Sequence, residues 1–361
     1  MTPLKQRIAR LIGASGPISV ADYMATCLFD PEHGYYTTRE PFGVAGDFTT
    51  APEISQMFGE LVAVWLYSAW KASGSPAGAT FAEIGPGRGT LMKDMLRVLG
   101  RLDTAFLGSA SVALIETSPR LRDVQKATLA ASGVNVAWHE SIATLPQSPL
   151  FIVGNELFDA IPTRQFVKAA DGWNERAIGI DASGELAFAA GPARIDAAIL
   201  PPEAAAAAAG TIFEFAPART AMMETIAERI AVYGGAGLFF DYGHLRPGLG
   251  DTLQALRKHR YEDVLANPGE ADLTSHVDFA ALATAARAHG LEAHGTTQGE
   301  FLLALGLLER AGSLGARGDE NAREKIRSEV ERLAGPDAMG TLFKALAVMP
   351  RGIKIPFPCV S

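Results

Sequence analysis

Short apolar runs alternate along the chain with segments that have helical periodicity. The apolar runs predict core strands over 80–84, 111–116, 133–138, 149–154, 237–240, 291–297 and 341–349. Apolar positions spaced three and four residues apart predict helices between them, including 56–70 and the segment that begins at Thr90. This alternation is typical of an α/β fold built on a mostly parallel sheet of seven strands.

The predicted elements divide the chain into five parts. Residues 1–70 form a helical N-terminal segment with a polar loop, and residues 71–164 form the first part of the α/β core. Residues 165–210 are read as an inserted β meander and linker, because apolar and polar positions alternate around glycines. Residues 211–244 are expected to continue the core. Residues 245–361 are expected to hold loops around the site, a helical insertion and the last core strands.

A glycine-rich turn follows the first predicted core strand. Gly85, Gly87 and Gly89 have the spacing G-x-G-x-G, and Glu83 precedes them. Glycines let a ligand approach the backbone, and the following helix offers free N–H groups to an anion. The turn departs from the dinucleotide pattern G-x-G-x-x-G and resembles that of class I S-adenosylmethionine (SAM) methyltransferases. The resemblance implies that Glu83 helps to accept hydrogen bonds from the SAM ammonium. A turn that only joins strand to helix is the alternative.

The ends of the second and third predicted strands offer further ligand contacts. Glu116 lies 31 residues after Gly85 and could accept hydrogen bonds from both ribose hydroxyls. A helix-capping carboxylate ahead of Ser118 is the alternative. The SAM methyltransferase fold would place Ser141 and Ile142 beside the polar edge and the face of the adenine.

One amide and two carboxylates follow the fourth predicted strand. Asn155, Glu156 and Asp159 are the candidate catalytic residues, and Asn155 is also a candidate cofactor ligand, because open α/β sheets bind ligands at the carboxyl ends of their strands. The alternative is a turn with helix caps, in which Asn155 is a cap and Asp159 is solvated. Glu214 and Asp241 are reserve candidates for the catalytic carboxylates.

A polar loop over 43–55 has two interpretations. It could cover the cofactor, with Thr50 and Pro52 among the contacts, since loops on rigid scaffolds often carry function. Alternatively it is an N-cap, in which Thr50 caps the next helix and Glu53 completes a capping box.

Composition narrows the range of partners. The net charge of −8 argues against a general nucleic-acid binder. The two cysteines, Cys27 and Cys359, lack metal-ligand spacing, so no metal site is expected, and they fit a reducing compartment. No apolar stretch is long enough to span a membrane and no secretory signal is evident, so we expect a cytoplasmic protein without membrane insertion.

Motifs spread over the chain resemble the MidA family of bacterial and mitochondrial SAM-dependent methyltransferases. They are GDFTTAPEISQMFG at 46–59, the turn at 85–89, NELFDAIP at 155–162, DYG at 241–243 and TQGEFLL at 297–303. The resemblance implies a class I, Rossmann-like fold with SAM as cofactor and a protein substrate. Its mitochondrial members, in the matrix, symmetrically dimethylate an arginine on a core subunit of respiratory complex I. A homodimer is compatible with the sequence.

Two other functions remain open at this point. A nicotinamide-dependent oxidoreductase would use a similar fold, although the glycine spacing disfavours it. A non-catalytic assembly protein on a methyltransferase fold would keep the cofactor motifs without turnover. An arginine acceptor is permitted by the Glu156 and Asp159 pair, since two carboxylates can hold a guanidinium, and the family resemblance supplies the preference for it.

Overall fold

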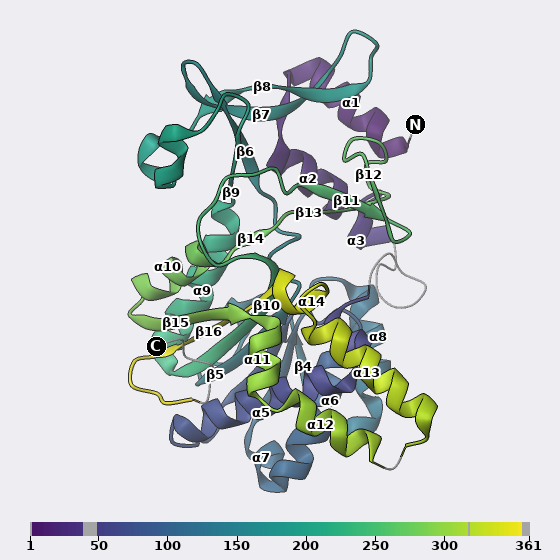
Figure 1. The fold of residues 1–361 in the computed structure, drawn as a ribbon, viewed down its shortest axis with the longest axis vertical. Helices are drawn as coiled ribbons and strands as arrows, with labels where there is room; N and C mark the ends of the chain where they lie inside the picture. Colours follow the sequence, from purple (N-terminus) through teal and green to yellow (C-terminus); the bar gives the residue numbers. More distant parts are fainter. Residues whose placement is uncertain (1, 39–48, 317, 356–361) are drawn as a thin grey trace. The chain divides into compact units, whose positions relative to one another are not determined.

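The computed structural model describes residues 2–38, 49–316 and 318–355, which fall into two compact units (Figure 1). The core unit comprises Thr49–Leu157, Ala221–Leu245 and Asp278–Ser361. The accessory unit comprises Met1–Phe48, Phe158–Thr220 and Arg246–Val277. Residues 43–48 of the predicted polar loop, and Cys359, lie outside the described residues.

The core unit is organised around a sheet whose main path runs β15-β16-β10-β5-β2-β3-β4. Five of its strands are parallel, and β16 is antiparallel to β10 and to β15. The seven strands are β2 (Thr80–Ile84), β3 (Ser111–Ile115), β4 (Val136–His139), β5 (Leu150–Asn155), β10 (Gly235–His244), β15 (Leu291–Thr297) and β16 (Phe343–Pro350). The predicted α/β fold with seven core strands is confirmed.

Helices of the core unit bury the apolar side chains of this sheet. Phe58 of α5 and Phe301 of α11 both pack edge-on against Phe240 of β10, with ring centroids 5.0 and 5.2 Å apart. The helices of the unit are α4 (Ala51–Ile54), α5 (Gln56–Ala72), α6 (Thr90–Leu102), α7 (Thr104–Ser109), α8 (Pro119–Leu129), α10 (Phe279–Ala288), α11 (Gln298–Ala304), α12 (Leu307–Gly315), α13 (Glu320–Ala334) and α14 (Met339–Leu342), with short 3-10 turns η1 (Ala130–Ser132) and η2 (Ile142–Thr144).

The accessory unit contains two sheets and the N-terminal helices. In the larger sheet β7 pairs with β8 and β6, and β6 pairs with β9. The elements are α1 (Pro3–Ser15), β1 (Ile18–Ser19), α2 (Val20–Phe29), α3 (Tyr35–Thr38), β6 (Arg164–Ala169), β7 (Gly172–Ile180), β8 (Leu186–Arg194), η3 (Ala197–Ile199), η4 (Pro202–Ala206), β9 (Ile212–Phe215), β11 (Gln254–Arg257), β12 (Arg260–Glu262) and β13 (Asp272–Thr274). The helix α9 (Pro217–Tyr233) and the two-residue strand β14 (Val277–Asp278) cross the unit boundaries.

Two sequence-based expectations for these segments are wrong. Residues 211–215 were expected to continue the core, but β9 pairs antiparallel with β6 of the accessory unit. Residues 252–255 and 272–279 were expected to be loops around the site, but they contribute to β11 and β13, which form a three-stranded sheet with β12. The turn between β11 and β12 holds Lys258 and His259 at φ 52° and 59°. A hairpin turn of this kind normally carries Asn or Gly, so its sequence signal is absent.

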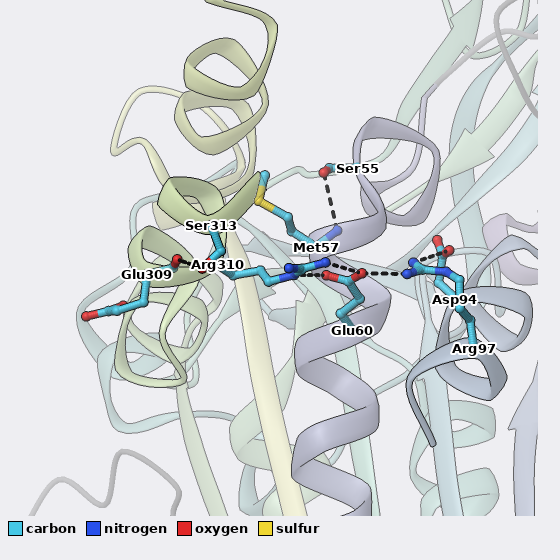
Figure 2. A network of polar contacts seen from close by, with 8 residues as sticks. All are labelled: Ser55, Met57, Glu60, Asp94, Arg97, Glu309, Arg310 and Ser313. Carbon is cyan, nitrogen blue, oxygen red and sulfur yellow. Dashed lines mark hydrogen bonds and ion pairs between the residues drawn. The ribbon is translucent and has the colours of Figure 1, made fainter. Parts of the chain in front are cut away.

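A buried carboxylate ties the inserted helix α12 to α5 and α6 (Figure 2). The side chain of Glu60 on α5 is 5% exposed and accepts hydrogen bonds from Arg97 of α6, at 2.8 Å, and from Arg310 of α12, at 2.5 and 3.0 Å. Arg97 also pairs with Asp94 at 2.9 Å. Because α6 begins at the glycine turn, this network links the helical insertion to the helix that carries the predicted ligand site.

Replacing Glu60 by Gln should destabilise the protein by about 3 kcal/mol, because both guanidinium groups lose their shared buried counter-charge. The measurement is chemical denaturation of the purified protein. The matched control is Glu324→Gln on α13, whose carboxylate pairs with Arg327 on an exposed surface, and which should leave the denaturation midpoint unchanged. Equal destabilisation by both substitutions would contradict a special role for the buried network.

Candidate functional site

The parallel register of the core sheet brings the predicted ligand residues to one edge. Ile84 of β2 pairs with Ile115 of β3 and with Gly154 of β5, and Ile115 pairs with His139 of β4. The residue that follows each of these positions therefore lies in one row at the carboxyl end of the sheet. That row contains Gly85, Glu116, Glu140 and Asn155. Ligands of open α/β sheets bind at this edge.

The glycine turn has the backbone conformation that its composition predicts. Gly85, Gly87 and Gly89 have φ values of 66°, 51° and 80°, which side chains rarely tolerate. The Gly85 N–H donates to the carbonyl of Ile115 at 3.2 Å, which fixes the turn to the end of β3. Gly89 is the N-cap of α6 and has no side chain with which to cap the helix. The turn therefore presents backbone N–H groups where an anionic group can bind.

Glu83 is a buried carboxylate directly behind this turn. Glu83 is the penultimate residue of β2 and is 3% exposed. The carboxylate accepts a hydrogen bond from the Met92 N–H in the first turn of α6, yet burial raises the pKa of Glu83 to about 8. Its Oε2 atom is buried and has no hydrogen-bond partner among the described residues. A buried acceptor of this kind fits a ligand ammonium group.

Glu116 stands at the end of β3 and is held by several donors. Its Oε1 accepts the Ser118 N–H at 2.8 Å, and its Oε2 accepts the Gln125 amide at 3.1 Å. Arg122 donates to its backbone carbonyl at 2.8 and 2.6 Å. Burial raises the pKa of the Glu116 carboxyl, and the hydrogen bonds from Ser118 and Gln125 oppose that shift. The alternative reading of Glu116 as a cap is partly right, since it binds a backbone N–H, but Ser118 is the N-cap of α8.

Ser141 and Ile142 begin the η2 turn after β4. Ser141 is exposed, and its carbonyl accepts the Thr144 hydroxyl at 2.9 Å. The Ile142 side chain is buried, and the backbone carbonyl of Ile142 accepts a hydrogen bond from the Arg229 guanidinium at 3.4 Å. Their predicted contacts with an adenine ring stay a prediction.

Asn155 and Glu156 form a bonded pair at the end of β5. The Asn155 amide donates to Glu156 Oε1 at 3.0 Å, and the Asn155 Oδ1 is buried with no partner among the described residues. Glu156 has φ +50°, unusual for a residue with a side chain, and its N–H donates to the Phe240 carbonyl at 2.8 Å. Strained backbone of this kind is concentrated at functional sites. The strand end thus holds the Glu156 carboxylate by both its backbone and its neighbour.

Asp159 belongs to the accessory unit, whereas Glu156 belongs to the core unit. Asp159 is 5% exposed, so the alternative of a solvated turn carboxylate is wrong for it. The backbone carbonyl of Asp159 accepts a hydrogen bond from the Arg219 guanidinium at 3.0 Å. The same guanidinium donates to the carbonyls of Ile161 and His276 at 3.0 and 2.7 Å. Arg219 is 3% exposed and clamps the segment after β5 to the 275–276 segment. Sequence reasoning did not identify Arg219, because each residue that it contacts is distant along the chain. Asp159 and Ile161 precede it by 60 and 58 residues, and His276 follows it by 57.

The two reserve carboxylates are held by partners of their own. Glu214 accepts hydrogen bonds from Gln165 at 2.8 Å and from the Thr252 N–H and hydroxyl, all within the accessory unit. Asp241 is fully buried, and its Oδ1 accepts the Tyr242 N–H at 3.0 Å. Glu156 and Asp159 stay the first catalytic candidates, with Glu214 and Asp241 in reserve.

The predicted capping box at Thr50 and Glu53 is absent. Thr50 is the N-cap residue of α4, but its side chain accepts no cap hydrogen bond. Glu53 instead accepts the hydroxyl of Thr90, the first residue of α6, at 2.5 Å. The described end of the loop is therefore fastened to the helix of the glycine turn. Cofactor contacts by Thr50 and Pro52, which are both buried, stay a prediction.

The charges at this edge suit a cationic ligand. Glu83, Glu116 and Glu156 lie at or beside the ends of three adjacent strands, while the α6 N-terminus supplies donors for one anionic group. SAM carries a sulfonium, an ammonium and a carboxylate. The carboxyl groups can accept hydrogen bonds from the ammonium, and the helix N-terminus can bind the carboxylate. Among residues 2–38, 49–316 and 318–355, no cluster of three or more His, Cys, Asp or Glu could hold a metal ion. In the same residues, no helix is long and apolar enough to cross a membrane.

Comparisons with known proteins show which family this chain resembles. A family model described as "Putative S-adenosyl-L-methionine-dependent methyltransferase" matches residues 61–297. The mitochondrial protein arginine methyltransferase NDUFAF7 of Homo sapiens is 34% identical, over 97% of this chain and 84% of that protein. Its Caenorhabditis elegans homolog is 33% identical, over 97% and 87%. The crystal structure of a Burkholderia thailandensis protein bound to S-adenosyl-homocysteine (SAH) has a TM-score of 0.84 and 31% identity, covering 98% of this chain and 93% of that one.

Binding of SAH should release close to one proton at pH 7. With a pKa of about 8, the Glu83 carboxyl is roughly 90% protonated at that pH, and a bound ammonium group would favour its ionised form. Calorimetric titrations in two buffers with different ionisation enthalpies measure the released proton. The Glu83→Gln variant should release none, and equal proton release by both proteins would contradict the assignment.

The same group should make the ligand-free protein less stable as the pH rises. Its folded-state pKa of about 8 lies above the unfolded value of about 4.3, so its stabilising contribution is complete below the unfolded value and lost as the pH rises through 8. The difference in melting temperature between wild type and Glu83→Gln should therefore change between pH 5 and 9. A constant difference would argue against a raised pKa.

Proposed function

The chain belongs to this family of S-adenosyl-L-methionine-dependent methyltransferases, and we propose that it methylates an arginine side chain of a partner protein. The observation that carries the proposal is the Asn155–Glu156 pair at the end of β5, which pairs with β2, the strand that leads into the glycine turn. A carboxylate held in this way can bind the N–H groups of a guanidinium. The relatives named protein arginine methyltransferase support the same acceptor.

The reaction is an in-line displacement on the sulfonium methyl group. A guanidinium nitrogen attacks the methyl carbon, the carbon–sulfur bond breaks, and its electron pair stays on sulfur to give SAH. The nitrogen must then lose a proton. Guanidinium is protonated and delocalised at neutral pH. Glu156 would therefore concentrate positive charge away from the attacking nitrogen and receive the proton. Asp159 is the second proposed catalytic residue.

The match to a methyltransferase family argues against a nicotinamide-dependent oxidoreductase. We propose further, from the motif resemblance, that the acceptor is a core subunit of respiratory complex I, met in the cytoplasm by bacterial members and in the matrix by mitochondrial ones. Symmetric dimethylation is the product that the resemblance implies. A non-catalytic assembly role is the outcome that the next experiment would favour if transfer fails.

Replacing Glu156 by Gln should lower methyl transfer by about two orders of magnitude or more while SAH affinity changes little, because the charge is needed mainly in the transition state. Asp159→Asn should act in the same direction, less strongly. The measurement is transfer of labelled methyl from SAM to purified complex I core subunits, beside an SAH titration of each variant.

Asp123→Asn is the matched control, since this carboxylate on α8 pairs with Lys126 on an exposed surface; it should keep full transfer. Full turnover by Glu156→Gln and Asp159→Asn would contradict the carboxylate mechanism. Parallel loss of SAH binding would make the two residues cofactor ligands. No transfer by wild type that still binds SAH would favour the assembly role.

A further inference from the structure

Gln125 is a fully buried polar side chain that no motif identifies, and it lies behind the cofactor edge of the sheet. It sits on α8, in the core unit, with no solvent exposure. Its amide nitrogen donates to the Gly87 carbonyl at 2.8 Å and to Glu116 Oε2 at 3.1 Å. Its amide oxygen accepts the Trp138 indole N–H at 3.0 Å. One side chain thus joins the glycine turn, the acid after β3 and the end of β4.

The three partners allow only one orientation of the amide group. Trp138 can only donate through its indole nitrogen, so it must face the amide oxygen. The Gly87 carbonyl and the Glu116 carboxylate can only accept, so they must face the amide nitrogen, and both of its hydrogens are used. Flipping the amide would set oxygen against two acceptors and nitrogen against a donor. The network therefore fixes Glu116 Oε2 relative to the backbone of the turn.

We propose that Gln125 is a positioning residue that sets the Glu116 carboxylate for the ribose hydroxyls of the cofactor. The inference rests on the proposed cofactor site. Gly87 and Glu116 lie on turns after different strands, and a ligand that touches both needs them at a fixed separation. Because Gln125 bridges the two, it transmits the position of the turn to the carboxylate. Trp138 holds the Gln125 amide oxygen by its hydrogen bond. The Nζ atom of Lys126 lies 6.0 Å from the centroid of the Trp138 ring.

The role predicts a loss of ribose discrimination and not only a loss of affinity. Wild type should bind SAH about tenfold to a hundredfold more tightly than its 2′,3′-dideoxy analogue, because a carboxylate then lacks its hydroxyl donors. In Gln125→Glu, whose second oxygen faces Glu116 and Gly87, this ratio should fall below about threefold. Trp138→Phe removes the donor that orients the amide. Since Trp138 is partly exposed, this variant should fold and should lower the ratio as well.

The experiment is calorimetric titration of the full-length protein and its variants with both ligands. Gln298→Met is the matched control, because Gln298 is another fully buried glutamine whose amide donates to a backbone carbonyl, that of Leu333, at 2.9 Å. This variant should keep the wild-type ratio even if its stability falls.

An unchanged ratio in Gln125→Glu and Trp138→Phe, with both affinities lowered equally, would overturn the positioning role and leave the proposed function intact. A wild-type ratio near one would also overturn it, since Glu116 would then not bind the ribose. Failure of wild type to bind SAH at all would overturn the proposed function together with the inference.

Discussion

The site depends on the hydrogen-bond register of the parallel core strands. Ile84, Ile115 and Gly154 pair across β2, β3 and β5, so the chain leaves these three strands at the same level. Residues that are 31 to 70 positions apart thereby share one edge. A shift of one residue in any strand would exchange the two faces of that strand. Every residue of β2 is buried, so the packing on both of its faces opposes such a shift. Burial of the core therefore also sets the ligand geometry.

Charge then selects the ligand for this edge. In the proposed site, three carboxyl groups at adjacent strand ends and one helix N-terminus would bind a ligand with two cationic groups and one anionic group. Glu83 makes the point most strongly, because burial keeps its carboxyl protonated at neutral pH until a cation reaches it. The same electrostatics would connect cofactor and acceptor, since Glu156, the carboxylate after β5, would hold the guanidinium of a protein acceptor.

Local sequence patterns predicted the parts of the site that depend on neighbouring residues. The strand, the glycine turn and the helix at 80–102 follow from apolar spacing and from three glycines that must adopt positive φ. The partners of Gln125 and Arg219 could not be predicted, because those contacts join segments that only the tertiary fold brings together. The short strands β11 to β13 were missed because a turn without Asn or Gly gives no hairpin signal. The spacing of Thr50 and Glu53 fits a capping box, but in the folded chain the Glu53 carboxylate accepts a hydrogen bond from the Thr90 hydroxyl instead.

The central claim is that the carboxyl edge of the core sheet binds SAM through its acidic strand ends and its glycine turn. A crystal structure of this protein grown with SAH tests it most directly. We expect the ribose hydroxyls within hydrogen-bond distance of the Glu116 carboxylate, the ammonium group against Glu83 Oε2 and the sulfur facing Asn155 and Glu156. Ligand density at another place in the molecule, or a ribose that turns away from Glu116, would contradict the claim.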